Sequence, residues 1–179
     1  MTDIAPELAV NRWFNTPSPI TLDSQRGRVV VLHAFQMLCP GCVAHGTPQA
    51  ERLHRMFGGD QVAVIGLHSV FEHHAAMPPV ALEAFIHEYR LTFPVGVDEA
   101  GSDGPIPVTM ARYGMRGTPT TIVVDRAGRL RQHYFGQVDD LALGVLIGSL
   151  ISGAPAVVAA SSSDRDGVCD EAGCARPSD

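Results

Sequence analysis

A run of strand-forming residues leads directly into a closely spaced pair of cysteines. Residues 29–35 read Val-Val-Val-Leu-His-Ala-Phe, and Cys39-Pro40-Gly41-Cys42 follows shortly afterwards. The run is rich in β-branched residues, which is typical of a strand buried on both faces. The segment after the cysteines has helical spacing, so Cys39 is expected at a helix N-terminus. Unpaired backbone N–H groups and the helix dipole favour a thiolate there. This order constrains the chain to an α/β architecture with the cysteines at the end of a buried strand.

Two cysteines separated by two residues can close a disulfide reversibly. The thiolate is the attacking species in disulfide exchange. We expect Cys39 to attack a partner disulfide, and Cys42, one helical turn further on, to attack the resulting mixed disulfide and release the reduced partner. The motif therefore predicts a thiol redox protein.

Length and charge exclude several other classes. The chain has 179 residues, 45% of them apolar, and a net charge of −6. This is enough for one globular domain with a good core. No basic block is present, which argues against a nucleic-acid partner. All 13 basic residues are Arg, so chemistry that needs a Lys is excluded.

Neither terminal region has the pattern of a membrane protein. Residues 1–7 contain acidic residues and no positively charged start before an apolar stretch, so we expect no secretory signal and a cytoplasmic location. Residues 141–163 carry no charge and are about long enough to cross a bilayer, but glycines and Pro155 interrupt them. A globular helix over 139–152 explains this segment better, so we expect no membrane contact.

Strand and helix patterns alternate along the chain. We predict strands over 29–35, 62–67, 93–97, 120–125 and 130–135, and helices ending at Gly58-Gly59 and over 78–90, 108–113 and 139–152. Residues 13–22, which contain two prolines, are predicted to be a short lead-in without a long helix. This order predicts an α/β layer architecture in residues 1–153, followed by a flexible Ser/Asp/Gly-rich tail over 154–179.

A second motif makes a resemblance specific. Arg116-Gly117-Thr118-Pro119-Thr120-Thr121 lies just before the apolar strand that begins at Ile122. Together with Cys39-Pro40-Gly41-Cys42, it resembles thioredoxin-fold proteins of the redoxin group, which includes TlpA/ResA-like oxidoreductases and AhpC/TSA peroxiredoxins. The resemblance covers roughly residues 11–153. It implies a thioredoxin fold, in which a central mixed sheet is flanked by helices, with an N-terminal extension.

The resemblance also implies site residues and partners. Pro119 is expected to be cis and to lie against the active-site cysteines. Thr118 would then present its backbone to an extended substrate segment, and Pro40 and Gly41 would also contact substrate. The expected partners are protein thiols or disulfides, or a reductant such as a thioredoxin or glutathione system. No cofactor and no metal are expected.

Several residues depart from the family pattern. Leu38 stands where thioredoxin-like proteins usually have Trp, and His33 stands where they have a buried Asp or Asn. His33 could accept the proton of Cys42 during resolution, because the ordinary pKa of imidazole is close to neutral. It could equally be a core histidine with a satisfied hydrogen bond. His45 is a second candidate for this role, and the helix proline of the family occurs one place late, as Pro48.

Peroxide reduction is the alternative activity. Cys39 would form a sulfenic acid with peroxide and Cys42 would resolve it as a disulfide. Peroxiredoxins typically have Thr where this chain has Gln36, together with an Arg that stabilises the thiolate. Arg112 or Arg116 could supply that cation, although a solvated charge is the simpler interpretation of each.

The tail carries a second pair, Cys169 and Cys174. These thiols could close a disulfide of their own, relay electrons to the first pair, or be incidental.

Two further hypotheses concern other classes of protein. One is a structural zinc site made by all four cysteines. The other is a redox-inactive adaptor that uses the groove at Pro119 for binding. His68, His73 and His74 also cluster in sequence and are interpreted as a polar segment near the rim of the site.

Overall fold

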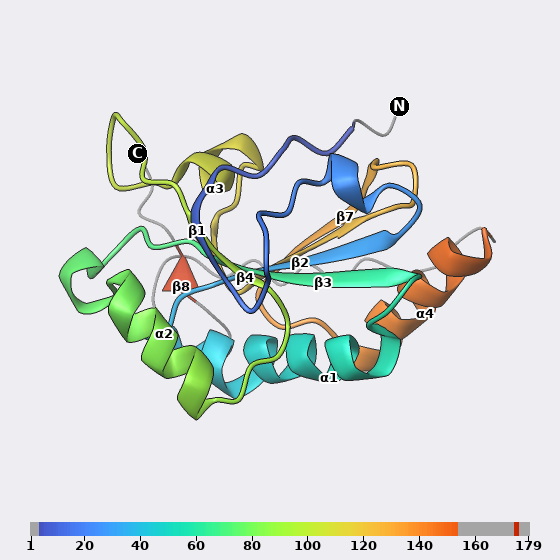
Figure 1. Cartoon of the computed structure of the whole chain (residues 1–179), viewed down its shortest axis with the longest axis horizontal. Coiled ribbons are helices and arrows are strands. Elements are labelled where there is room, and N and C mark those ends of the chain that lie inside the picture. Colours follow the sequence, from blue (N-terminus) through green and yellow to red (C-terminus); the bar gives the residue numbers. More distant parts are fainter. Residues whose placement is uncertain (1–3, 154–173, 176–179) are drawn as a thin grey trace.

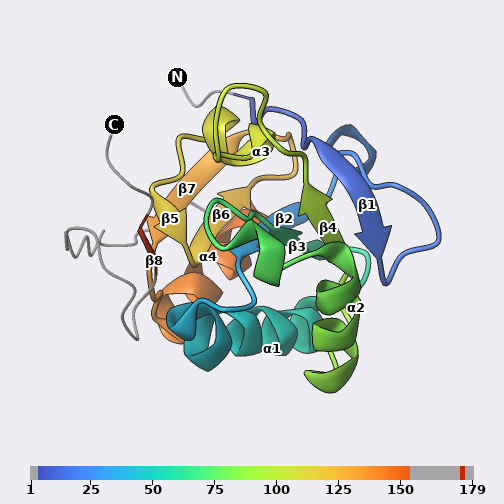
Figure 2. The same cartoon turned by 90° about the vertical axis from the view of Figure 1, so that its left-hand side faces the viewer.

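A six-stranded mixed sheet forms the centre of the molecule (Figure 1). The computed structural model describes residues 4–153, 174 and 175. The strands follow the order β1-β4-β3-β2-β6-β7 across the sheet. Figure 2 shows α1, α2 and α4 on one side of the sheet and α3 on the other. The bounds are β1 Val10–Phe14, β2 Val29–Phe35, β3 Val62–His68, β4 Val95–Asp98, β6 Thr120–Val124, β7 Leu130–Phe135, α1 Thr47–Phe57, α2 Pro79–Glu88, α3 Val108–Arg112 and α4 Asp140–Ser152.

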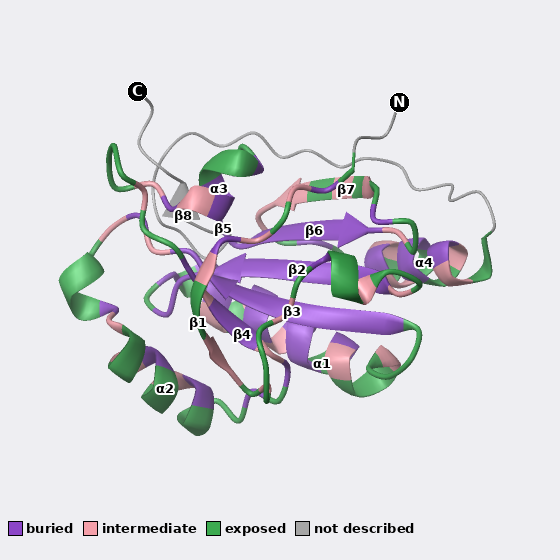
Figure 3. Ribbon diagram, turned by 45° about the horizontal axis from the view of Figure 1, so that its top comes forward, coloured by how far each residue is buried: buried purple, intermediate pink, exposed green. Residues whose placement is uncertain are grey.

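Strand β2 is the central element of the sheet. It pairs in parallel with β3 and antiparallel with β6. Every residue of β2 and β3 is buried, as the colouring in Figure 3 shows. Two covered faces explain why these strands read as apolar runs and do not alternate. The predicted α/β architecture with a mixed central sheet is therefore confirmed.

The N-terminal region contributes more than the predicted lead-in. Strand β1 pairs antiparallel with β4, with Trp13 opposite Gly96, and closes one edge of the sheet. A Cβ atom at Gly96 would lie 2.9 Å from Val10 Cγ1, so the glycine lets β1 approach β4 closely. The residues of β1 are intermediate or exposed, and such a short, partly exposed strand has only a weak sequence pattern.

The helix that starts after Cys39 contains a wide turn. Residues Cys42–Gly46 form a π-helix, which continues directly into α1. A π turn holds one residue more than an α turn. Pro48 stands at the start of α1, where a missing backbone N–H costs little.

The last described helix, α4, begins with a well-formed cap and ends at a glycine. The Asp139 side chain accepts hydrogen bonds from the backbone N–H groups of Leu141 and Ala142. Gly153 follows the helix with a φ of 73°. Within residues 4–153, no helix has the length and apolarity needed to cross a bilayer.

Two short strands form a second sheet. Strand β5 (Gly117–Thr118) pairs antiparallel with β8 (Cys174–Ala175). The tail predicted over 154–179 otherwise lies outside the described residues, so its flexibility stays a prediction, whereas Cys174 and Ala175 are held on β5.

Glu51 ties α1 to the segment that precedes β4. Its carboxylate accepts hydrogen bonds from the Thr92 backbone N–H at 2.9 Å, the Thr92 hydroxyl at 2.7 Å and Arg55 Nε at 2.8 Å. Burial opposes ionisation of this carboxyl. The three hydrogen bonds outweigh burial and hold the pKa of Glu51 below its ordinary value of 4.5.

Replacing Glu51 by Gln should lower the free energy of unfolding at neutral pH by about 1–3 kcal/mol. The folded-state pKa lies below the unfolded one, so the contribution of the carboxylate is complete above the unfolded pKa and is lost as the pH falls through the folded pKa. Urea unfolding of both proteins from neutral to acidic pH measures this, and the two free energies should converge in acid. A difference that stays constant with pH would contradict the assignment.

Candidate active site

The two cysteines of the predicted motif lie together where β2 meets its following helix. Both are reduced and both are buried, with Cys39 1% and Cys42 0% exposed. The backbone N–H of Cys42 donates to Cys39 Sγ across 3.4 Å. The Cys39 carbonyl accepts the first helical hydrogen bond, from Val43 N at 3.0 Å. Cys39 therefore holds a capping position, and its sulfur faces the positive end of the helix dipole, as the sequence predicted.

The environment separates the roles of the two thiols. Burial raises the pKa of Cys42 well above its ordinary value, and the hydrogen bond and negative charge of Cys39 raise it further. Hydrogen bonds from the Gln36 backbone and the Thr118 side chain offset only part of this increase. Cys42 is thus the thiol that is harder to ionise, which is the order required if Cys39 attacks first.

The second motif packs directly against the cysteines. The Thr118–Pro119 peptide bond is cis, which confirms the prediction for Pro119. Cys39 Sγ lies 3.4 Å from the Thr118 carbonyl oxygen, close enough for its S–H to donate to this oxygen. The Pro119 carbonyl accepts from Gly136 N at 2.8 Å, which fixes the loop to the end of β7. Two motifs 79 positions apart in the sequence thus meet at one sulfur atom.

Gln36 connects the cysteine loop to its surroundings, a role that sequence reasoning missed. Its side-chain Nε2 lies 3.3 Å from Glu72 Oε1 and 3.5 Å from Thr118 Oγ1, and its Oε1 accepts from Phe71 N at 3.3 Å. Its backbone carbonyl accepts from Cys39 N at 3.2 Å. Gln36 is 1% exposed, so these bonds hold the cysteine loop, Thr118 and the loop after β3 together. The available signal in the sequence was a Gln directly after the apolar run 29–35 and three residues before Cys39.

His33 lies in the core behind the site. Its ring is 1% exposed, stacks on Phe35 and makes a 3.2 Å hydrogen bond between Nε2 and Thr47 Oγ1. Burial lowers the pKa of His33 to about 3, so the imidazole is neutral at neutral pH. The hydrogen bond to Thr47 agrees with the interpretation as a satisfied core histidine. Its role as proton acceptor for Cys42 stays a prediction.

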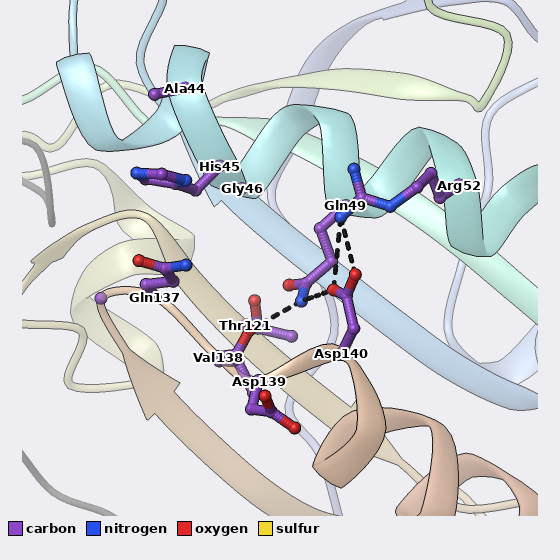
Figure 4. Close-up of a pocket in the computed structure, with 11 residues that line it drawn as sticks. Ala44, His45, Gly46, Gln49, Arg52, Thr121, Gln137, Val138, Asp139 and Asp140 are labelled. Carbon is purple, nitrogen blue, oxygen red and sulfur yellow. Dashed lines mark hydrogen bonds and ion pairs between the residues drawn. The ribbon is translucent and has the colours of Figure 1, made fainter.

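His45 lines a polar pocket beside the helix segment that carries Cys42. The pocket has a volume of about 310 Å³ and lies between this segment and the residues that lead into α4 (Figure 4). On its floor, Asp140 is bound by Gln49 at 2.6 Å and by Arg52 at 2.9 Å. The charge of Asp140 is therefore already compensated within the pocket.

The remaining predicted residues take different places. His68 is buried, with its pKa lowered by burial to about 4, whereas His73 and His74 are exposed. No three potential ligands among His, Cys, Asp and Glu come together to form a metal site in residues 4–153 or at 174 and 175. The zinc hypothesis also involves Cys169, which lies outside the described residues, so it is untested.

The two arginines considered for a peroxide site are both exposed. Arg112 Nη1 donates to the Glu7 carbonyl at 2.9 Å. The guanidinium of Arg116 lies over the ring of Phe135, 5.1 Å from its centroid. Pro40 is exposed beside Cys39, whereas Gly41 is buried in the first turn of the helix.

Comparison with known proteins places this site in a family. The model of the AhpC/TSA family matches residues 1–133. The chain belongs to the AhpC/TSA family. Among solved structures, a thioredoxin-like superfamily protein is 55% identical with a TM-score of 0.82, and the match covers 86% of this chain and 99% of that chain. A thiol-disulfide isomerase from Corynebacterium glutamicum is 53% identical with a TM-score of 0.81, covering 84% and 97%. The predicted thioredoxin fold is therefore confirmed for this AhpC/TSA protein.

The curated relatives are more distant and longer. Protein DipZ from Mycobacterium tuberculosis is 26% identical over 153 residues, which are 84% of this chain but 21% of DipZ. Thiol-disulfide oxidoreductase ResA from Halalkalibacterium halodurans is 26% identical over 117 residues, or 65% of this chain and 59% of ResA. These names agree with the enzyme class expected for an AhpC/TSA protein with this dithiol.

Gly46 provides a test of how tightly the site is packed. A Cβ atom there would lie 2.6 Å from His33 Cε1 and 3.0 Å from Pro119 Cβ. Gly46→Ala should therefore lower the free energy of unfolding by about 1–3 kcal/mol, although Ala has the better helix propensity. Gly144→Ala in α4, where a Cβ meets nothing within 4 Å, is the matched control and should stabilise by up to about 1 kcal/mol. Equal effects of the two substitutions in thermal or urea unfolding would contradict this close packing.

Proposed function

We propose that this protein is a thiol-disulfide oxidoreductase that uses the Cys39–Cys42 dithiol. The supporting observation is the position of Cys39 Sγ, 3.4 Å from the helix N–H of Cys42 and 3.4 Å from the carbonyl next to the cis proline. One sulfur atom is thus in contact with a stabilising helix end, a resolving thiol and the backbone edge where a substrate strand can pair.

The exchange proceeds in two displacements. The Cys39 thiolate attacks one sulfur of a partner disulfide, a bond forms between them, and the other partner sulfur leaves as a thiolate. Cys42 then loses its proton and attacks Cys39 Sγ, which breaks the mixed disulfide and releases the second partner thiolate. The products are a reduced partner and a Cys39–Cys42 disulfide, so two electrons pass to the partner.

The electrostatics of the pair support this order. Burial is the largest cause of the raised pKa of Cys42, and a negative charge on Cys39 raises it further. Once Cys39 is bound in a mixed disulfide, that charge is gone and only burial opposes the ionisation of Cys42. Formation of the intermediate therefore makes Cys42 easier to deprotonate. His33 was the proton acceptor expected from the sequence, but burial lowers its pKa to about 3, which opposes uptake of a proton, and its Nε2 bonds Thr47 Oγ1.

The surface around Cys39 determines what can bind. Leu38 is 57% exposed and Pro40 is exposed, so an apolar rim replaces the Trp of related proteins. The partner we propose is an extended peptide segment of a protein with an accessible disulfide. It would pair with the backbone of Thr118 and cover the rim with apolar side chains. In the cytoplasm that the sequence predicts, reduction by a thioredoxin or glutathione system would regenerate the dithiol.

Thiol peroxidase activity is the second candidate, because the AhpC/TSA family model matches residues 1–133. In this activity Cys39 would be the peroxidatic thiol. Gln36 stands where a peroxiredoxin has its Thr, and its side chain contacts Thr118 and Glu72. This difference is why disulfide exchange is proposed first.

Both variants of this test also carry Cys169→Ala and Cys174→Ala, which removes the two tail thiols. In this background Cys42→Ser should trap the protein on its partner. Without the resolving thiol, the mixed disulfide between Cys39 and a peptide disulfide should persist and approach one adduct per chain on non-reducing mass spectrometry. Cys39→Ser is the control and should form none, because Cys42 is buried with a raised pKa. An adduct on Cys42 in the Cys39→Ser chain would reverse the assigned roles.

The relative reactivity of the reduced protein separates the two candidate activities. We expect loss of the Cys39 thiol to be faster with a peptide disulfide than with the same concentration of hydrogen peroxide. Quenched alkylation of Cys39, read by mass spectrometry, follows both reactions. Reaction with peroxide orders of magnitude faster than that of an ordinary low-pKa thiol would establish a peroxidase instead.

A further inference from the structure

The backbone edge proposed for substrate carries a segment of the chain itself. Strand β8 pairs antiparallel with β5, with Cys174 opposite Thr118 and Ala175 opposite Gly117 (Figure 2). An extended segment that adds to an exposed strand edge is a common mode of peptide recognition. In β8, Cys174 takes the pairing position opposite Thr118, the residue before the cis proline.

The register brings Cys174 to the neighbourhood of the Cys39 sulfur. Residues directly opposite in an antiparallel pair have Cα atoms about 4.5–5.5 Å apart. The carbonyl oxygen of Thr118, the partner of Cys174, lies 3.4 Å from Cys39 Sγ. Thr118 is thus the link between the two cysteines: its backbone pairs with Cys174, and its carbonyl oxygen contacts Cys39 Sγ.

Burial of Cys39 points in the same direction. Cys39 is 1% exposed. An external disulfide must displace part of the surrounding chain before it can reach the sulfur. The backbone of β8 already pairs with this edge, with Cys174 opposite Thr118.

We propose that the segment at Cys174 is an internal substrate of the Cys39–Cys42 centre. This inference rests on the exchange activity proposed above. In the oxidised protein, the Cys174 thiolate attacks Cys39 Sγ of the Cys39–Cys42 disulfide. The Cys39–Cys174 bond forms, the Cys39–Cys42 bond breaks, and Cys42 leaves as a thiolate that takes up a proton. The number of disulfides is unchanged, so the step needs no external oxidant or reductant.

The docked segment also regulates access to the site. The edge of β5 pairs with one strand at a time, so the chain's own β8 competes with any external peptide. A partner must therefore bind this edge more tightly than a tethered segment held at high effective concentration.

A register-shift experiment tests the proposal in the full-length chain. The first variant, Cys42→Ala/Cys169→Ala, keeps Cys39 and Cys174. The second adds Cys174→Ala and Ala175→Cys, which moves the tail thiol by one position. Adjacent residues of a strand lie on opposite faces, so this shift moves the thiol to the other face of β8. Both variants are equilibrated in glutathione redox buffers, and the intramolecular disulfide is quantified by mass spectrometry after acid quenching and alkylation.

The proposal predicts an effective concentration for the Cys39–Cys174 pair at least about tenfold above that of the shifted pair. Equal values would show a tether without docking and would overturn the inference. Glutathionylation of Cys39 in both variants reports the exchange activity separately. If Cys39 forms no mixed disulfide with glutathione in either variant, the proposed function fails; if it does and the two values are equal, only the internal substrate fails.

Discussion

The contact between the Cys39 sulfur and the Thr118 carbonyl depends on one pairing in the sheet, that of β2 with β6. These strands run antiparallel, with His33 opposite Thr121 and Ala34 opposite Thr120. The last residues of β2 and the first residues of β6 therefore lie side by side at one end of the strands. The cysteine loop leaves β2 at this end, and the cis-proline loop enters β6 there. The pairing of β2 with β6 is therefore what brings the two motifs together.

Burial at this end then sets the chemistry. The same apolar surroundings raise the pKa of Cys42 and lower the pKa of His33, because both shifts disfavour a charged group away from water. Cys39 differs because its sulfur faces the N–H groups of a helix end. The two sulfurs therefore meet different surroundings one helical turn apart. This difference supports the proposed order, in which Cys39 attacks and Cys42 resolves.

Two separate groups of hydrogen bonds offset the cost of burying these polar side chains. Gln36 connects Thr118, Phe71 and Glu72, and His33 is satisfied by Thr47. Gly46 lets the helix approach His33 and Pro119 without a side chain between them. The strand edge at β5 is different, since it is completed by β8 from the far end of the sequence. Addition of an extended segment to such an edge is the mode of peptide recognition that we propose for the partner.

The sequence by itself determined the α/β class and the cysteine pair at the end of a buried strand, through an apolar run and a Cys-x-x-Cys spacing. The cis form of Pro119 was implied by the resemblance to the redoxin group, and the structure has it. Tertiary structure alone decided the edge strand β1, the contacts of Gln36, the π turn at Cys42–Gly46 and the docking of Cys174 on Thr118. These features arise from backbone pairing and side-chain contacts between distant segments. Backbone N–H and C=O groups are common to almost every residue type, so a pairing made through them leaves little trace in a single sequence.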